Sequence, residues 1–449
     1  MSRIRKIVSI TLFFILSSGL LFGAGSERPR YIFLFIGDGM GLSQTAAAEL
    51  YLNAVNHKSD PIQTRRELSV TSFPVTGLMT THSADDYITD SAAAGTAMDS
   101  GMKAKNGFFS SGDKGLLTEH FIKEGYRTAI LTNVPADHAT PAAFYTRSLH
   151  RKAYYEIARE MVRSPVEIIA GSALLGNTPR AKEGKPELFE GDEKRVRVSL
   201  DKEKIKWPDE PGARVLLIPD EEMGQFPYTI DDPDNGLMEK AFLSILDRLN
   251  EGPFFFVIEG GNIDWACHNN DTATVVREVI AFDRVIRKAV EFYHRYPDET
   301  LILVTGDHET GGLALGSETA ESLSPALLRE QACSSEMMAI RTKNSSESFQ
   351  DIVVAFFGED FYLYIKERGK EELLKSRWND VRKEADFYTR LAFFEELTDL
   401  FAGRAGFSWA TGGHSGSPVP VWALGEGSLG FTGLYDNIRL YEKILKLIP

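Results

Sequence analysis

The sequence predicts an α/β protein built on a largely parallel β-sheet. Short runs rich in β-branched and aromatic residues alternate with longer stretches of helical periodicity, which is the pattern of βαβ units. With 449 residues, of which 43% are hydrophobic and 25% charged, the chain can form one large α/β core with insertions. The predicted strands are residues 31–36, 128–132, 167–170, 215–218, 254–258, 301–305 and 419–424. The predicted helices are residues 43–55, 91–98, 117–124, 273–294 and 436–448.

Two stretches interrupt this alternation. Residues 177–211 are rich in Lys, Glu, Gly and Pro, which is typical of a surface excursion. Residues 318–407 form a longer insertion whose second half has helical periodicity and alternating charges. Because clusters of polar residues stand on both sides of this insertion, we expect it to be a helical cap near the functional site. We expect residues 26–449 to form a single domain.

The N-terminus has the layout of a secretory signal. Basic residues within positions 3–6 precede an apolar run at 7–21 and small residues at 23–25. We therefore predict a signal peptide over residues 1–25 and export to the periplasm or the outside. The alternative is an uncleaved anchor, because Phe22 fits the usual small-residue cleavage pattern poorly. No later stretch of the sequence is long and apolar enough to span a bilayer.

The overall charge and the cysteines limit the classes of partner and of metal site. A formal net charge of -14 argues against nucleic-acid binding, which normally requires a basic face. It does not exclude phosphorylated substrates, because bound metal ions supply local positive charge. The two cysteines, Cys267 and Cys333, lack the spacing of a zinc site, and we expect plain thiols. Any metal must then be held by His, Asp, Glu or Thr.

Acidic and histidine residues follow three of the predicted strands. The carboxyl ends of parallel strands meet at one edge of a sheet, where ligands bind. His414 stands in a further glycine-rich loop. Each residue alone could be a helix cap or a core residue, but the joint pattern predicts a metal site with open positions for substrate. The residues after the strands are Asp38, Glu259, Asp264, His268, Asp307 and His308.

Ser91 is the candidate nucleophile. It begins an alanine-rich stretch, so it is expected at a helix start, where free N–H groups and the helix dipole favour an anion. Asp90 or Ser91 could instead be a simple helix cap. The chain has no G-x-S-x-G motif, which argues against a serine triad. Arg147 and Arg151 could each clamp a phosphate or be ordinary surface charges.

Six segments, in the same order along the chain, resemble the alkaline phosphatase family. They are Gly37-Asp38-Gly39-Met40, Asp90-Ser91-Ala92, His138-Ala139-Thr140-Pro141, Glu259-Gly260-x-x-Ile263-Asp264-x-x-x-His268, Asp307-His308 and Gly413-His414-Ser415-Gly416. The resemblance implies a large central sheet with helices on both faces and a homodimer. It also implies hydrolysis of small phosphate monoesters through a phosphoserine intermediate.

By this resemblance, the site would hold two zinc ions and one magnesium ion. The first zinc would be bound by Asp264, His268 and His414. The second would be bound by Asp38, Asp307 and His308, with Ser91 beside it. The magnesium would be bound by Asp38, Thr140 and Glu259. Arg151, eleven residues after Thr140, matches the family's phosphate-binding arginine, which would leave Arg147 peripheral.

The chain departs from the best-known bacterial members at two positions. His138 stands where they have Asp, and Trp265 stands where they have Lys, beside the magnesium site and the phosphate respectively. The identity of the third metal therefore stays open. The rival interpretations are a phosphodiesterase or sulfatase relative and a non-catalytic binder of metal or phosphate. The sulfatase motif C/S-x-P-x-R is missing, and a binder would leave Ser91 without a role. The sequence does not predict the natural substrate.

Overall fold

The computed structural model describes residues 28–448 except 58–64, 111, 148–149, 191–194, 201–204, 211–212, 221, 321 and 384–385. The predicted signal peptide at 1–25 lies outside the described residues. Within them, no helix combines the length and the apolar character needed to cross a membrane. Cys267 and Cys333 are both buried, and neither forms a disulfide.

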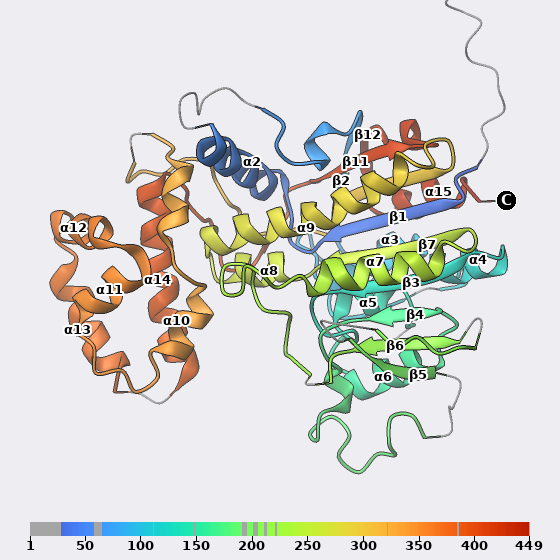
Figure 1. Cartoon of the computed structure of the whole chain (residues 1–449), viewed down its shortest axis with the longest axis horizontal. Helices are drawn as coiled ribbons and strands as arrows, with labels where there is room; N and C mark the ends of the chain where they lie inside the picture. Colours follow the sequence, from blue (N-terminus) through green and yellow to red (C-terminus); the bar gives the residue numbers. More distant parts are fainter. Residues whose placement is uncertain are drawn as a thin grey trace, which may run out of the picture.

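A ten-stranded sheet crosses the molecule in the order β12-β2-β11-β8-β1-β7-β3-β4-β6-β5 (Figure 1). All neighbouring pairs of these strands are parallel except the two that β11 forms with β2 and β8. The strands are β1 (Tyr31–Gly37), β2 (Val75–Thr80), β3 (Arg127–Thr132), β4 (Ile168–Ala170), β5 (Arg195–Ser199), β6 (Arg214–Ile218), β7 (Phe254–Gly260), β8 (Thr300–Gly306), β11 (Val419–Gly425) and β12 (Gly433–Asp436).

The three central strands end at the same level. β1 pairs with β7 and β8 in a register that sets Gly37 opposite both Gly260 and Gly306. Every residue of these three strands is buried, as expected for strands covered on both faces. The loops that follow them therefore leave the sheet side by side, which brings the polar residues after each strand to one edge.

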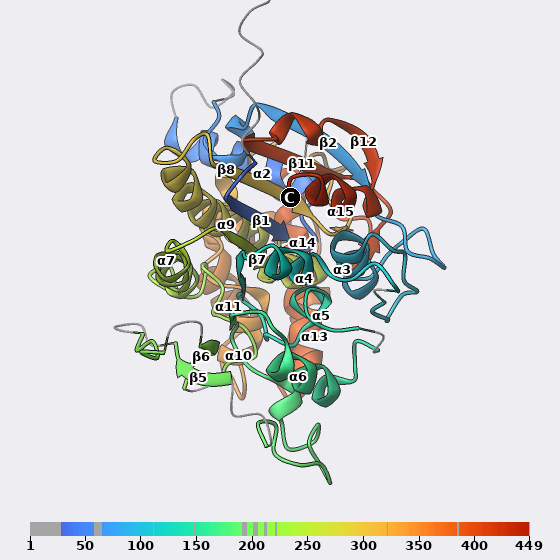
Figure 2. The same cartoon turned by 90° about the vertical axis from the view of Figure 1, so that its right-hand side faces the viewer.

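Helices cover both faces of the sheet and bury two separate cores. Alternate residues of β1 point to opposite faces, so Phe33 and Phe35 lie in one core and Leu34 and Ile36 in the other. Figure 2 shows α7 and α9 on one side of the sheet and α3, α4 and α15 on the other. The prediction of a mostly parallel sheet with helices on both faces is confirmed. The helices of the sheet region are α2 (Leu42–Asn56), α3 (Ser91–Ser100), α4 (Leu117–Lys123), α5 (Ala139–Ala143), α6 (Tyr154–Arg163), α7 (Leu237–Leu249), α8 (Asn262–His268), α9 (Thr272–Tyr293) and α15 (Ile438–Leu445).

Three strands of the sheet were not predicted from the sequence. β5 lies within the stretch 177–211, which was expected to be a surface excursion, yet it forms the edge of the sheet beside β6. Its sequence, Arg-Val-Arg-Val-Ser, carries charges typical of an exposed edge, and these hide the apolar signal of a strand. β2 and β12 are also short and only partly buried, so they lack the long apolar runs that mark the central strands.

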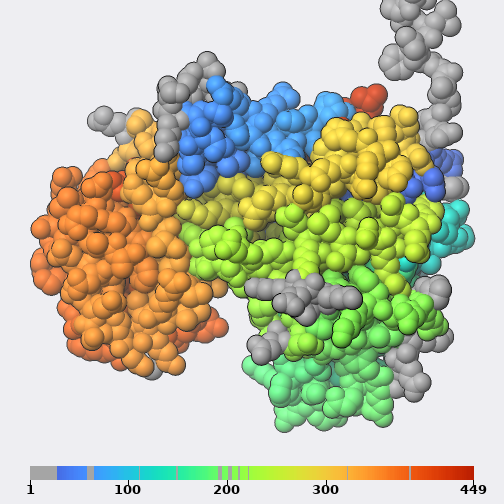
Figure 3. Space-filling model, in the orientation of Figure 1, coloured from blue at the N-terminus to red at the C-terminus, as the bar shows by residue number. Residues whose placement is uncertain are grey.

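The insertion at 318–407 is helical and forms a lobe at the end of the sheet (Figures 1 and 3). Its helices are α10 (Ser335–Arg341), α11 (Phe349–Phe357), α12 (Glu359–Glu367), α13 (Glu371–Val381) and α14 (Phe387–Ala405). Trp378 is fully buried among them against Phe393 and Phe394. The lobe contacts the sheet region through Glu336, which accepts a hydrogen bond from Asn269 Nδ2 at 2.9 Å. Asn269 directly follows His268, so the insertion touches the edge that carries the predicted site.

A substitution at Gly425 tests how closely the antiparallel strand β11 packs against β8. The φ of Gly425 is +99°, and a Cβ atom added there would lie 2.0 Å from the carbonyl oxygen of Thr300. We expect Gly425→Ala to lower the free energy of unfolding by about 2 kcal/mol or more, since both the backbone conformation and the contact become strained. Gly430→Ala, where an added Cβ meets nothing within 4 Å, is the matched control. Equal midpoints for the two variants in urea unfolding would contradict this account of β11.

Candidate metal centre

Three groups of possible metal ligands lie at the carboxyl edge of the central strands. In each group the ligand atoms lie within 4.8 Å of one another. The groups share members, so they form one continuous cluster. They are Asp38 with Asp307 and His308; Asp264 with His308 and His414; and Asp38 with His138 and Glu259.

The first group is fully buried and joins the ends of β1 and β8. His308 Nε2 lies 3.3 Å from Asp38 Oδ1 and 3.3 Å from Asp307 Oδ2. The other oxygen of Asp307 accepts hydrogen bonds from the backbone N–H of Gly39 at 3.1 Å and of His308 at 2.9 Å. The backbone thereby fixes this carboxylate and leaves Oδ2 directed into the cluster. This group is the same as the predicted ligand set of the second zinc.

Gly39 is required where the loop after β1 passes beneath the cluster. Its φ is +70°, and an added Cβ would lie 2.8 Å from both Asp264 Oδ1 and Thr310 Oγ1. A residue with a side chain would therefore push Asp264 away from the histidines. Glycine allows the backbone to approach the carboxylate closely while its N–H holds Asp307.

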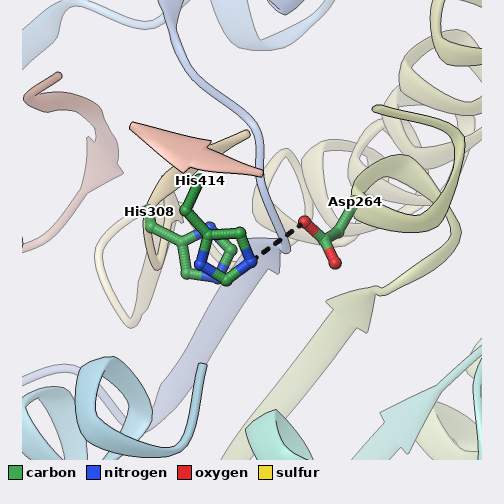
Figure 4. Close-up of side chains that lie close together, drawn as sticks. All are labelled: Asp264, His308 and His414. Carbon is green, nitrogen blue, oxygen red and sulfur yellow. Dashed lines mark ion pairs between the residues drawn. The ribbon is translucent and has the colours of Figure 1, made fainter. Parts of the chain in front are cut away.

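The second group is drawn in Figure 4, where the rings of His308 and His414 lie face to face and Asp264 points toward them. The ring centroids are 3.6 Å apart, and His414 Nε2 lies 3.9 Å from Asp264 Oδ1. The sequence predicted His268 in this set. His268 Nε2 lies 3.3 Å from both Asp264 Oδ2 and His414 Nε2, so the structure brings it to the same place. His308 lies between this set and the first one.

Backbone carbonyls orient two of these histidines. His268 Nδ1 lies 2.7 Å from the carbonyl oxygen of Gly412, and His414 Nδ1 lies 2.7 Å from that of Thr89. A ring nitrogen that donates to a carbonyl leaves Nε2 as the basic, metal-binding nitrogen. Both Nε2 atoms therefore face the cluster.

The third group includes a residue that was expected only beside it. His138 joins Asp38 and Glu259, and the Thr140 hydroxyl donates to Asp38 Oδ2 at 3.3 Å. The His138 ring packs edge-to-face on Trp265, with centroids 5.7 Å apart. The two positions at which the chain departs from the best-known bacterial pattern are thus in contact with each other.

The cluster fits divalent cations because several of its buried polar atoms lack a hydrogen bond. Among the described residues, four such atoms in the cluster lack a hydrogen bond, although buried polar groups nearly always make one. They are Asp38 Oδ1, Asp307 Oδ2, Glu259 Oε1 and His138 Nδ1. Nitrogen and oxygen donors of this kind suit zinc, and the oxygen-rich third group also suits magnesium.

Burial without bound cations shifts the pKa of several groups in the cluster. Burial raises the pKa of Asp307 to about 8 and that of Glu259 to about 7, and it raises the pKa of Asp38 well above its usual value. Burial also lowers the pKa of His138 to about 4. For His268, burial acts in the opposite direction, but contact with Asp264 raises its pKa to about 9. The metal-free cluster therefore retains protons on carboxylates, which is the state that bound cations would replace.

Ser91 is the first residue of α3 and lies against this cluster. Its Oγ is 3.2 Å from His308 Nε2, and the residue is almost fully buried. Asp90 caps the helix by accepting the N–H of Ala93 at 3.0 Å, so the cap belongs to Asp90 and leaves the Ser91 hydroxyl free for another role. Of the two candidate helix caps, Asp90 and not Ser91 is therefore the cap of α3.

The two arginines differ in position. Arg151 Nη1 lies 2.9 Å from Asp90 Oδ2, next to Ser91. Arg147 instead pairs with Glu119 and is more exposed. The structure therefore brings Arg151, and not Arg147, to the candidate nucleophile.

Two threonines that the sequence analysis did not identify support the cluster. Thr310 Oγ1 donates to Asp264 Oδ1 at 2.5 Å and lies 3.2 Å from His308 Nδ1. Thr132, the last residue of β3, donates to Glu259. Thr310 stands only two residues after His308, and Thr132 ends a strand beside β7; position at the strand ends was the only signal available for either.

Comparisons with known proteins give one consistent result. A family model described as alkaline phosphatase matches residues 29–173 and 221–448. Alkaline phosphatase 4 of Bacillus subtilis is 27% identical over 472 residues, covering 99% of this chain and 96% of that protein. The cold-active alkaline phosphatase of Shewanella sp. superposes with a TM-score of 0.75 at 27% identity, covering 93% of this chain and 100% of that one.

A further solved structure is similar in fold and contains a metal. It is a variant of the alkaline phosphatase from the Antarctic bacterium TAB5 in which one histidine is replaced by aspartate, and magnesium is bound in its M3 site. Its TM-score is 0.63 at 24% identity, and the match covers 94% of this chain and 98% of that one.

The raised pKa values predict how the metal-free protein responds to pH. Glu259 and Asp307 retain protons in the folded state up to about pH 7 and about pH 8, whereas the unfolded chain loses them near pH 4. The folded state then binds more protons, so its free energy of unfolding falls as pH rises. His268, with its pKa raised to about 9, acts in the same direction. Between pH 6.5 and pH 9 we expect a loss on the order of 3 kcal/mol.

Thermal unfolding in a chelator across this pH range measures the effect. Below pH 6.5 the lowered pKa of His138 acts in the opposite direction, so the window is chosen above it. The same scan with zinc and magnesium should be flat or rise with pH, because cations favour the deprotonated carboxylates. A metal-free protein whose midpoint does not fall between pH 6.5 and 9 would argue against an unsatisfied carboxylate cluster.

Proposed function

The chain belongs to the alkaline phosphatase family of phosphomonoester hydrolases, and from this premise we propose its mechanism: hydrolysis of phosphate monoesters through a covalent phosphoserine on Ser91. The observation that carries the proposal is the position of the Ser91 hydroxyl, 3.2 Å from His308 Nε2 at the edge of a cluster of unpartnered ligand atoms. A nucleophile beside a multi-cation site is the arrangement that phosphoryl transfer requires.

We assign two zinc ions and one magnesium ion to the cluster. Asp264, His268 and His414 would hold one zinc, and Asp38, Asp307 and His308 the other. Glu259, Thr140 and Asp38 would hold the magnesium, with His138 beside them. When bound, these cations supply the positive charge that favours ionised Ser91 and offsets the charge of the phosphoryl group.

The residues of the chain then divide the reaction between them. Ser91 Oγ attacks phosphorus, the ester oxygen departs with the alcohol, and a phosphoserine forms. A water molecule then attacks the same phosphorus and releases inorganic phosphate, restoring the serine. Arg151 donates hydrogen bonds to two phosphoryl oxygens, and Asp90 holds its guanidinium in place at 2.9 Å. The free N–H groups at the start of α3 add to the stabilisation of the anion.

We also propose that the protein is exported, with residues 1–25 as its signal, and that it acts as a homodimer on small phosphomonoesters. We further propose that the helical insertion at 318–407 caps the site. Contact between Glu336 and Asn269, next to His268, supports a position from which the insertion can limit access to the metal cluster.

Ser91→Ala tests the nucleophile. We expect kcat for p-nitrophenyl phosphate at alkaline pH, with zinc and magnesium present, to fall at least ~1000-fold, because the covalent step is lost. Ser100→Ala is the matched control: it removes another buried hydroxyl, at the other end of the same helix, and should leave kcat within about threefold of wild type.

The outcomes separate the rival functions. Metal-dependent turnover that survives in Ser91→Ala would point to direct attack by water, without a covalent intermediate. A folded, metal-loaded wild type without turnover would sink the phosphatase mechanism and favour a diesterase or a binder. Assays with bis(p-nitrophenyl) phosphate and metal titrations by calorimetry would then decide between those two.

His138→Asp tests the third metal position. A carboxylate in place of an imidazole adds a hard oxygen ligand, so we expect magnesium affinity to rise about 10-fold. The magnesium in the M3 site of the TAB5 variant, itself a histidine-to-aspartate replacement, supports this direction. His138→Asn removes the imidazole without adding charge and is the control. Magnesium bound per chain, measured by elemental analysis after equilibrium dialysis, should rise only in the aspartate variant.

A further inference from the structure

A pocket of about 530 Å³ lies between the first turn of α6 and the loop that follows β4. This loop runs along the lower edge of the molecule in Figure 1, next to α6. One wall of the pocket is formed by Lys152, Tyr154 and Tyr155, and the other includes Leu175, Arg180 and Lys185. Its size is in the range that holds a small ligand.

The pocket is basic, although the chain as a whole has a net charge of -14. Three cationic side chains and one acidic side chain line it. The acid, Glu156, is already paired with Lys185 at 2.7 Å. No ion pair involving Lys152 or Arg180 is present within the part of the chain that the structure describes. The pocket therefore offers two uncompensated cations to an anionic group.

Both walls are tied to the metal centre through neighbouring residues. Lys152 directly follows Arg151, whose guanidinium lies against Asp90 beside Ser91. On the other wall, the backbone N–H groups of Leu175 and Gly176 donate to the Asp137 carboxylate at 2.8 Å and 2.7 Å. Asp137 directly precedes His138. The pocket is thus fixed in position relative to the site where the phosphoryl group would react.

The outer part of the loop is held in place by α6. Tyr155 Oη donates to the carbonyl oxygen of Pro186 at 3.0 Å, and Arg159 Nη1 donates to those of Leu188 and Glu190 at 2.5 Å and 3.0 Å. An added Cβ on Gly176 would lie 2.4 Å from the carbonyl oxygen of Tyr154, so the loop packs directly on the helix. The pocket is therefore formed before any ligand arrives, which reduces the entropic cost of binding.

One wall of this pocket lies outside the part of the chain that the family model matches. Residues 174–220 lie between the two segments that match the family model, and they include Leu175, Arg180 and Lys185. The other wall, with Lys152 and the two tyrosines, lies in the matched part. A loop outside the family match thus places its cations against a part of the fold that the family model matches, and together they form a site that the metal centre does not require.

We propose that this pocket binds the second phosphate of a bisphosphorylated substrate whose first phosphate reacts at Ser91. The inference rests on the proposed function and narrows its substrate class to phosphomonoesters that carry another phosphate on the leaving group. Lys152 and Arg180 donate to the second phosphate, which is not cleaved in the same turnover. The carbon skeleton between the two phosphates passes over the faces of Tyr154 and Tyr155.

Alkanediol bisphosphates of increasing chain length test this proposal, because the chain length sets the distance between the two phosphates. Each is compared with the alkyl monophosphate of the same length, using the zinc- and magnesium-loaded enzyme. We expect the ratio of kcat/KM for the bisphosphate over the monophosphate to pass through a maximum of about 10-fold at the length that reaches the pocket, mainly through a lower KM. Shorter chains should show no advantage, and added salt should reduce the maximum.

The variant Lys152→Gln/Arg180→Gln, which removes the two cations that have no ion pair, should abolish this maximum. Because each variant is judged by its own ratio of bisphosphate to monophosphate, any general loss of activity cancels. Lys182→Gln is the control for loss of positive charge nearby: Lys182 lies on the same loop as Arg180, pairs with Glu187 at 3.2 Å and does not line the pocket. It should keep the maximum at the same chain length.

The inference is overturned if no chain length gives an advantage in the wild type, or if the advantage survives in the double variant. It is also overturned if Lys182→Gln loses the advantage to the same extent, since charge on the surface would then be the cause. If the wild type turns over neither ester, the proposed function fails. The proposal that the pocket binds a phosphate is then tested by binding measurements alone. Calorimetry should then show tighter binding of the bisphosphate to the wild type than to the double variant, and equal affinities would reject the site.

Discussion

The structure of the site depends on one electrostatic constraint: four carboxylates are buried together at the edge of a sheet. Asp38, Glu259, Asp264 and Asp307 are each almost fully removed from solvent. Like charges in such surroundings repel strongly and lose their hydration, so the arrangement is stable only with protons or cations among them. The register of β1, β7 and β8 creates this situation, because it delivers all four side chains to the same level.

Hydrogen bonds from the surrounding structure hold these crowded carboxylates in place. Backbone N–H groups hold one oxygen of Asp307, and the hydroxyl groups of Thr310 and Thr132 hold Asp264 and Glu259. In each case one oxygen atom is satisfied by the protein and the other points inward. This explains why the atoms that lack a hydrogen bond are also candidate metal ligands: the protein forms hydrogen bonds to the carboxylate oxygens that a cation would not bind. The same logic applies to His268 and His414, whose Nδ1 atoms face backbone carbonyls.

The sequence predicted the parts of this arrangement that leave a strong local signal. The apolar runs of β1, β7 and β8 and the polar residues that follow them identified both the sheet and most of the candidate ligands. β5 and β12 were missed because short, partly exposed strands lack such runs. The way in which the ligands are grouped in space was harder to predict from the sequence. That His308 lies between two sets, and that His138 reaches Asp38 and Glu259, depends on side-chain directions that spacing along the chain does not determine.

The direction of β11 explains why His414 precedes its strand while the other ligands follow theirs. β11 runs antiparallel to β8, so its first residues, not its last, lie at the site. The chain consequently leaves the site after Thr310, builds the helical lobe, and returns at His414, which pairs with Thr310 in a two-residue ladder. The zinc assigned to Asp264, His268 and His414 would therefore link the chain before the lobe to the chain after it. Like a covalent cross-link, it would close a long loop and remove chain entropy from the unfolded state. The lobe could then differ in length or sequence without moving its two fixed ends.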